Sequence, residues 1–374
     1  MNGTDDVLDP PDCSDRRNLA FFVAKTLAVL GYRFLTSVHL EMDPEILPLR
    51  RREGTVFFYV GLHKSLWETS GILVPLYRAR MPLPYVGMGD NLIHGRLFQE
   101  LSKKVGTFLI RRPANRQEVL ESARHLRKTV LGFLVRGLDI LVFPEGTRKS
   151  VPTRAGYGDF FPAPFEPLLE YERNKERLCA ANPGCQPKDA YIVPFNVDYS
   201  CVREAHEMVA VGSGKPQTLN VFDSLSMLRH IGGTYVTYGA PVRVAGLLDL
   251  DRKKLAVECR RMCMDLVKIL PINVASLAML RLPEGAPFTS AALEREVAGV
   301  VAALKPHADR FRGFTPGEAP AEIIRLARHG RPRFEGPDPE ELPLYRLYAA
   351  YIRHYLPPDP RPEAALDPSS VRSC

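Results

Sequence analysis

Residues 55–68 read Thr-Val-Phe-Phe-Tyr-Val-Gly-Leu-His-Lys-Ser-Leu-Trp-Glu. The first half is an uninterrupted apolar run of strand-forming residues, which predicts a strand that is covered on both faces. Gly61 should let the chain turn, so His63 should lie at the carboxyl end of the strand, where open α/β sheets bind their ligands. A helix should follow, because Ser65 and Glu68 stand at capping-box spacing.

His63 and Glu68 are five residues apart across this predicted strand–turn–helix junction. On a single helix they would point about 140° apart, so they meet only if His63 lies in the turn. A carboxylate beside an imidazole fixes its tautomer and raises its basicity, and the other ring nitrogen can then take a proton from a substrate hydroxyl. A plainer interpretation stays open, in which Ser65 and Glu68 only cap a helix and His63 is an ordinary turn residue.

The composition is that of a globular protein of one large domain or two modest ones, with 374 residues, 45% hydrophobic and 25% charged. The net charge of +7 fits an anionic substrate or membrane surface and is too small to predict a nucleic-acid partner. Seven cysteines without a C-x-x-C pair argue against a disulfide framework or a zinc site and favour a reducing cytosol. Cys259 and Cys263 should be buried thiols on one helix face.

Apolar runs alternate with helical periodicity over residues 50–282, which predicts an α/β core with a mostly parallel sheet flanked by helices. Besides 55–61, strands are expected at 83–89, 107–111, 139–143, 190–197 and 235–238. Helices are expected from Ser65, with a kink or end at Pro75, and at 96–105, 116–135, 166–178 and 255–269, the last one ended by Pro271.

The segments outside this core differ in character. Residues 1–15 and 357–374 are polar or rich in proline, which predicts disorder. Residues 16–49 should form an N-terminal helical segment, with a basic amphipathic helix to Val38 that either lies on a membrane surface or packs on its own domain. Residues 283–356 should form a small helical appendage. The acidic start is unlike a signal peptide, and no run reaches the ~20 apolar residues of a membrane span, so any membrane attachment should be peripheral.

Three further segments carry residues suited to chemistry. Phe143–Lys149 reads Phe-Pro-Glu-Gly-Thr-Arg-Lys and follows a predicted strand, so Gly146 should form a tight turn whose exposed N–H groups bind an anion or oxyanion. Gly106–Arg112 is a strand ending in two arginines, of which one should face the site because neighbours on a strand alternate. Ile192–Tyr199 is a strand with an internal proline. Each segment also has a plainer interpretation. Phe143–Lys149 could be a turn with a surface ion pair, the arginines of Gly106–Arg112 could be solvated charges at a strand end, and Ile192–Tyr199 could be a strand at a sheet edge.

Taken together, four segments resemble motifs I to IV of the glycerolipid acyltransferases, in the same order: His63-x4-Glu68, Gly106–Arg112, Phe143–Lys149 and Ile192–Tyr199. They are most similar to the glycerol-3-phosphate and dihydroxyacetone-phosphate acyltransferase branch. The resemblance covers about residues 50–282, and residues 283–356 weakly. It implies an α/β core at the cytoplasmic face of a membrane, and acyl transfer from acyl-CoA or acyl-carrier protein to glycerol 3-phosphate.

The resemblance also implies roles for individual residues. His63 would be the general base, oriented by Glu68. Acceptor-binding residues, including those for its phosphate, would come from the second and third motifs: Arg111, Arg112, Glu145, Gly146, Thr147, Arg148 and Lys149. The expected partners are the acyl donor, the acceptor and a membrane surface, with no nucleic acid, no metal and no cofactor.

Glu68 departs from this family, whose first motif has aspartate at that position. Glutamate is one methylene longer and has to fold back to reach His63, and capping at Ser65 would compete for the same carboxylate. A non-catalytic acyl- or lipid-binding homologue therefore stays an alternative. The third motif contains Glu-Gly-Thr-Arg, the form shared with lysophosphatidate-type enzymes, so lysophosphatidate or another lipid alcohol stays an alternative acceptor.

Overall fold

The computed structural model describes residues 8, 36–65, 68–89, 106–111, 116–146, 157–202, 205–212, 232–283, 287–328, 334–336, 338 and 341–357. The chain divides into two compact units. Unit 1 comprises residues 1–148, 159–197 and 234–266, and unit 2 comprises residues 149–158, 198–233 and 267–374.

An eight-stranded sheet forms the core of unit 1. Its strands are β1 (Ser37–Met42), β2 (Thr55–Gly61), β3 (Tyr85–Gly89), β4 (Thr107–Ile110), β5 (Ile140–Val142), β6 (Asp189–Tyr199), β7 (Gly233–Tyr238) and β8 (Val242–Arg243), with the last two residues of β6 and the first of β7 grouped with unit 2. The order across the sheet is β1-β7-β6-β2-β5-β3-β4, and β8 pairs with β6.

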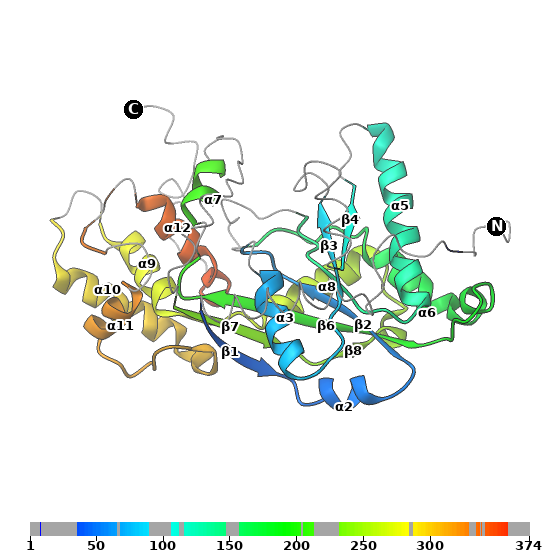
Figure 1. Cartoon of the computed structure of the whole chain (residues 1–374). Coiled ribbons are helices and arrows are strands. Elements are labelled where there is room, and N and C mark those ends of the chain that lie inside the picture. Colours follow the sequence, from blue (N-terminus) through cyan, green and yellow to red (C-terminus); the bar gives the residue numbers. More distant parts are fainter. Residues whose placement is uncertain are drawn as a thin grey trace. The chain divides into compact units, whose positions relative to one another are not determined.

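The five strands from β6 to β4 run parallel to one another, whereas β8 is antiparallel to β6. Figure 1 shows β3 and β4 upright while β2 and β6 run across the view, so the sheet is strongly twisted. The expected fold class, a mostly parallel sheet flanked by helices with a helical C-terminal region, is confirmed.

β2 lies in the middle of the sheet and all seven of its residues are buried, as its apolar run predicts. Gly61 pairs with Phe195 of β6, and a Cβ atom on Gly61 would lie 2.2 Å from the Phe195 ring. Our expectation that Gly61 turns the chain is wrong, because Gly61 is still part of β2 and its φ is not positive. Glycine is needed here because an aromatic ring occupies the space of a side chain.

Replacing Gly61 with alanine is expected to lower the free energy of unfolding by about 1–3 kcal/mol, because the new methyl group would overpack the core against Phe195. Denaturant unfolding followed by circular dichroism measures the change. Gly246→Ala is the matched control in unit 1, since no atom lies within 4 Å of a Cβ there. An unchanged midpoint for Gly61→Ala would show that Phe195 moves aside freely.

At the amino-terminal edge of the sheet, Asp139 connects β2 to β5. This carboxylate is fully buried, accepts the backbone N–H of Phe57 at 3.0 Å and pairs with Arg50 at 3.1 Å. The Asp139 carbonyl accepts the N–H of Tyr85, at the start of β3, at 2.8 Å. These contacts hold three parallel strands in register, and that register determines which residues meet at the opposite edge.

Helices cover the sheet of unit 1. They are α2 (Ile46–Arg51), α3 (Glu68–Arg78), α5 (Arg116–Val135), α6 (Phe165–Ala180), the 3-10 turn η4 (Val244–Leu247) and α8 (Arg252–Met264). α5 packs on α6, α6 packs on α8, and α8 contacts β2 (Figure 1). Pro75 does not end its helix, as one of our two expectations had it, because α3 continues three residues further to Arg78. The helix expected at 96–105 lies outside the described residues.

Cys259 and Cys263 are both fully buried on α8, as their spacing predicts. The Cys263 thiol donates to the carbonyl of Val60 in β2 at 3.3 Å. Burial raises the pKa of the Cys259 thiol and, well above its usual range, the pKa of the Cys263 thiol. Both side chains are therefore packing groups that join α8 to the sheet rather than nucleophiles.

The expectations for the N-terminal segment fall mostly outside the described residues, and the described part corrects one of them. Val38, where we expected the amphipathic helix to end, lies in strand β1, and residues 16–35 lie outside the described part of the chain. The segment 1–15, which we expected to be disordered, lies outside the described residues except for Leu8, which is buried. Its N–H donates to Asn182 Oδ1 at 2.9 Å, and its carbonyl accepts from Arg136 at 2.9 Å. These two polar partners hold Leu8 in place.

Unit 2 is helical. It contains α7 (Ala205–Gly212), α9 (Pro271–Arg281), α10 (Ser290–Leu304), the 3-10 turn η5 (Lys305–Arg310), α11 (Pro320–Ala327), α12 (Leu342–Ala350) and the 3-10 turn η6 (Arg353–Tyr355). α9 contacts α10, α11 and α12, and nine of its residues, Pro271 to Met279, are buried. Asn273 donates to the carbonyl of Tyr348 in α12 at 2.9 Å.

The structure places the boundary after the sheet earlier than residue 282, where we had placed it. Unit 2 begins its last segment at Val267, so α9 belongs to the helical unit and not to the core. Pro271 begins α9 as its first residue instead of ending the preceding helix, which stops at Met264. Proline fits a first helical position because its missing N–H has no partner to lose there.

Candidate functional site

His63 lies two residues beyond the end of β2, at the carboxyl edge of the parallel strands. β5 is the parallel neighbour of β2, and the register pairs Val60 with Val142. The loops that leave these two strands therefore start side by side, and the loop after β5 carries Glu145. This is the edge at which open α/β sheets bind ligands, as expected from the sequence.

The imidazole of His63 contacts the carboxylate of Glu68, with Nδ1 2.6 Å from Oε2. The Glu68 side chain is fully buried, whereas the His63 side chain keeps 17% of its surface exposed. A buried carboxylate accepts the proton on Nδ1, which leaves the basic lone pair on Nε2. The pair thus has the geometry of an oriented general base.

The second oxygen of Glu68 accepts the backbone N–H of Lys64. We expected the carboxylate to divide between His63 and the helix cap at Ser65, and in the structure it contacts His63 and also the main chain of Lys64. α3 begins at Glu68 in the described residues, and each oxygen of its side chain has its own partner. The extra methylene of glutamate lets one carboxylate reach both the ring and the main chain of the histidine loop.

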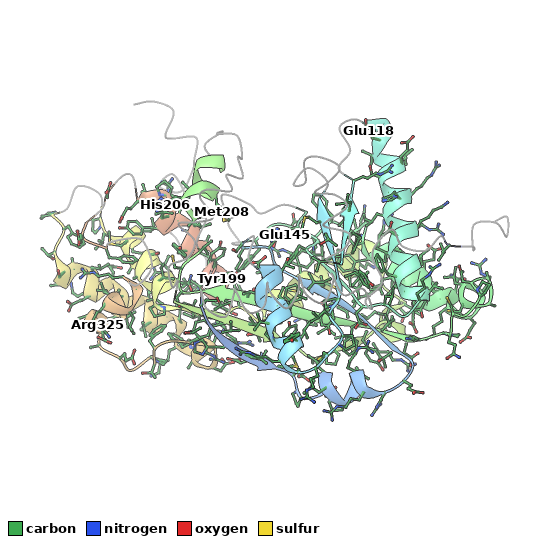
Figure 2. All side chains as sticks on the ribbon, in the orientation of Figure 1. Glu118, Glu145, Tyr199, His206, Met208 and Arg325 are labelled. Carbon is green, nitrogen blue, oxygen red and sulfur yellow. The ribbon has the colours of Figure 1, made fainter. Side chains whose placement is uncertain are left out.

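Phe143 and Glu145 hold His63 from the neighbouring loop. The Phe143 ring stacks on the imidazole, with 4.5 Å between centroids and 21° between planes, and its edge packs against Phe195 at 5.7 Å. Glu145, labelled in Figure 2, is 3% exposed, and its Oε1 accepts the backbone N–H of His63 at 3.0 Å. One buried carboxylate therefore contacts the imidazole of His63, and a second one holds the backbone N–H of the same residue.

Residues 143–146 form a hydrogen-bonded turn. The N–H of Gly146 donates to the carbonyl of Phe143 at 3.0 Å, and Gly146 has a φ of 71°, which confirms the expected tight turn. We also expected exposed N–H groups here to bind an oxyanion. For Gly146 this is wrong, because its N–H is used within the turn. The Phe161 ring lies against Gly146, 2.9 Å from where a Cβ would be.

The remaining predicted site residues are not brought together in the described structure. Arg111 follows β4 and its side chain is exposed. β5 and β3 lie between β2 and β4, so the ends of β2 and β4 are separated by three strand spacings, roughly 14 Å. Arg112, Thr147, Arg148 and Lys149 lie outside the described residues.

Phe143 and Phe195 have individual roles in the site that their sequence positions did not predict. Phe143 is the last residue of the strand predicted at 139–143, but its contact with His63 depends on β5 lying beside β2, which the local sequence does not show. No local signal existed for Phe195, since its contact depends on β6 lying beside β2. Within the described residues, no group of three or more His, Cys, Asp or Glu side chains could hold a metal ion.

Part of the chain matches a known protein family. Residues 47–195 match the sequence model of the Acyltransferase family. The match includes both strands and both loops of the site, and it confirms the resemblance to acyltransferases at the level of this family. It supports an enzyme that transfers acyl groups, whereas the glycerol-3-phosphate branch stays a prediction.

Among solved structures, the chain is similar to the crystal structure of the 1-acyl-sn-glycerophosphate (LPA) acyltransferase PlsC from Thermotoga maritima. The sequences are 15% identical, the TM-score is 0.39, and the similarity covers 67% of this chain and 80% of that chain. No curated protein sequence matches the chain.

Proposed function

We propose that this chain is an O-acyltransferase of phospholipid biosynthesis, which moves a fatty acyl group from acyl-CoA or acyl-carrier protein to a hydroxyl of glycerol 3-phosphate. The observation that carries the proposal is the contact of 2.6 Å between His63 Nδ1 and the buried Glu68 carboxylate. Its position at the carboxyl edge of the sheet and the Acyltransferase match over residues 47–195 support it.

In the proposed reaction, Nε2 of His63 takes the proton of the acceptor hydroxyl as its oxygen attacks the thioester carbonyl. A carbon–oxygen bond forms, and the tetrahedral intermediate collapses as the carbon–sulfur bond breaks. The imidazolium gives its proton to the leaving thiolate, so the products are the ester and a free thiol. Glu68 stabilises the imidazolium between these two steps. The acyl group is never attached to the protein.

For the acceptor, we propose that Arg111 or Arg112, with Thr147, Arg148 and Lys149, binds its phosphate. Arginine suits this role because its planar fork binds two phosphate oxygens at once. Arg111 follows the carboxyl end of β4, so it lies at the same edge of the parallel sheet as the loop of His63. The long arginine side chain and the acceptor together have to span the interval between the two strand ends.

A lysophosphatidate-type acceptor is the second candidate. It is favoured by the sequence Glu-Gly-Thr-Arg at residues 145–148, which resembles the third motif of those enzymes. The non-catalytic alternative depended on Glu68 failing to reach His63. The contact between the two side chains supports the enzyme over that binding protein.

We also propose that the protein acts at the cytoplasmic face of a membrane, where its ester product would partition, and that it needs no metal or cofactor. The segment expected to touch the membrane, residues 16–38, lies mostly outside the described residues. None of the helices that the structure describes is long and apolar enough to cross a bilayer.

The proposal is tested by measuring thiol release from palmitoyl-CoA and from palmitoyl-acyl-carrier protein. Parallel reactions contain glycerol 3-phosphate, dihydroxyacetone phosphate, lysophosphatidate or no acceptor. We expect release that depends on glycerol 3-phosphate. If thiol release depends on lysophosphatidate alone, the proposed type of reaction stands, but its acceptor is lysophosphatidate and not glycerol 3-phosphate. If no acceptor supports release with either donor, the proposed function is wrong.

A further inference from the structure

We infer that Glu145 is a positioning residue that holds the main chain of His63, and not a ligand of the acceptor. The effects on kcat and KM that we expect from this role rest on the proposed function. The resemblance implied acceptor binding for the third motif, to which Glu145 belongs. The described geometry instead directs this carboxylate at the histidine loop.

Two observations carry the inference. Oε1 of Glu145 lies 3.0 Å from the backbone nitrogen of His63, and the residue is 3% exposed. A hydrogen bond from a backbone N–H to an ionised carboxylate is about twice as strong as one between neutral groups. A buried carboxylate offers little surface to a substrate, and it repels the phosphate of the proposed acceptor because both are anions.

Glu145 acts together with Glu68. The backbone N–H groups of His63 and Lys64 are consecutive, and each donates to a different buried carboxylate. The same turn that carries Glu145 also stacks Phe143 on the imidazole. The ring nitrogen, the ring face and the main chain of His63 are therefore each held by a separate contact.

This arrangement determines where Nε2 lies relative to the acceptor hydroxyl. A displacement of about 1 Å at a reacting group can cost on the order of 10²-fold in rate. Losing Glu145 should therefore lower kcat, because the base is misplaced, and leave the affinity for the acceptor phosphate unchanged. A ligand of the acceptor would show the opposite pattern.

The first test compares Glu145→Ala with Glu145→Gln. Glutamine keeps a carbonyl oxygen of the same reach, so it can still accept the N–H of His63, whereas alanine cannot. We expect Glu145→Ala to lower kcat about 10²-fold with the acceptor KM within about twofold of the native value, and Glu145→Gln to stay within about tenfold in kcat. A raised acceptor KM with native kcat, or equal losses in both variants, would overturn the inference.

A structural defect is distinguished by two controls. Glu172 is 7% exposed, accepts the backbone N–H of Ala190 at 3.3 Å and pairs with Lys175 at 2.8 Å elsewhere in unit 1, so Glu172→Ala reports the cost of losing a buried carboxylate together with its ion pair. In a His63→Ala background, Glu145→Ala should lower the residual rate no further, because the two residues act through one base. An additional loss there would contradict a positioning role.

Amide hydrogen exchange at His63 tests the contact without any activity. We expect protection of the His63 amide in the native protein and in Glu145→Gln, and faster exchange in Glu145→Ala. Native-like exchange in Glu145→Ala would overturn the inference even in an active enzyme. Should the protein transfer no acyl group, this measurement still decides whether Glu145 holds the histidine loop, so the two failures are distinguishable.

Discussion

Replacing His63 with alanine is expected to lower acceptor-dependent thiol release by on the order of 10⁴-fold, because the variant has no base at the edge of β2. The imidazole is oriented by Glu68 at 2.6 Å and by the Phe143 ring at 4.5 Å, so most of its catalytic value lies in a fixed position. The kcat should fall while the KM values stay near those of the native protein.

His39→Ala is the matched control for this loss. His39 is also a stacked histidine in unit 1, with its ring 4.7 Å from that of Tyr235, but it is exposed in β1 and lies outside the site. We expect His39→Ala to keep native activity. If His63→Ala keeps more than about a tenth of the native rate, His63 is not the general base.

Changing Glu68 should have the second largest effect. Glu68→Gln keeps the size of the side chain but removes its charge, and one of its two acceptor oxygens becomes an NH₂ group. Either the ring nitrogen of His63 or the N–H of Lys64 then loses its acceptor. In a Ser-His-Asp triad, replacing the orienting carboxylate by its amide lowers kcat about 10⁴-fold. We therefore expect the kcat of Glu68→Gln to fall by about 10³–10⁴-fold. The rate of thiol release at a saturating concentration of the acceptor measures this kcat.

Glu68→Asp separates the enzyme from the non-catalytic alternative. Aspartate is shorter by one carbon–carbon bond, about 1.5 Å, and from the same backbone position it cannot keep both contacts of Glu68. We expect kcat to fall about 10–100-fold, although aspartate is the residue of the resembling motif. A rise in activity on Glu68→Asp would instead show a decayed site that the substitution repairs.

Local sequence was sufficient for the first contact of the site. The apolar run of β2, the turn after it and the helix that follows bring His63 and Glu68 together within one short segment, so their spacing alone predicts that they can meet. The alternation of apolar runs and amphipathic helices likewise predicted the parallel sheet and the long helix α5, the latter with both of its ends. These features depend on backbone periodicity and on neighbours in the chain.

Tertiary structure decided the remaining contacts. Glu145 is 82 residues from His63 in sequence, and it reaches the histidine only because β5 lies beside β2. That neighbourhood also makes Phe143 a stacking partner, just as the pairing of β2 with β6 makes Gly61 a close contact of Phe195. Periodicity shows that a strand is buried but not which strand lies next to it.

Because periodicity does not identify the neighbours of an element, the sequence also placed the boundary between the units too late in the chain. Residues Pro271 to Met279 of α9 are all buried because three helices contact it, and its sequence does not show whether those neighbours are helices or a sheet. Adjacent residues were enough to predict most strands of the parallel sheet and the pair of His63 with Glu68, since both depend on local sequence. The tertiary structure decided which distant groups fix that histidine, because strand order and side-chain packing depend on the whole fold.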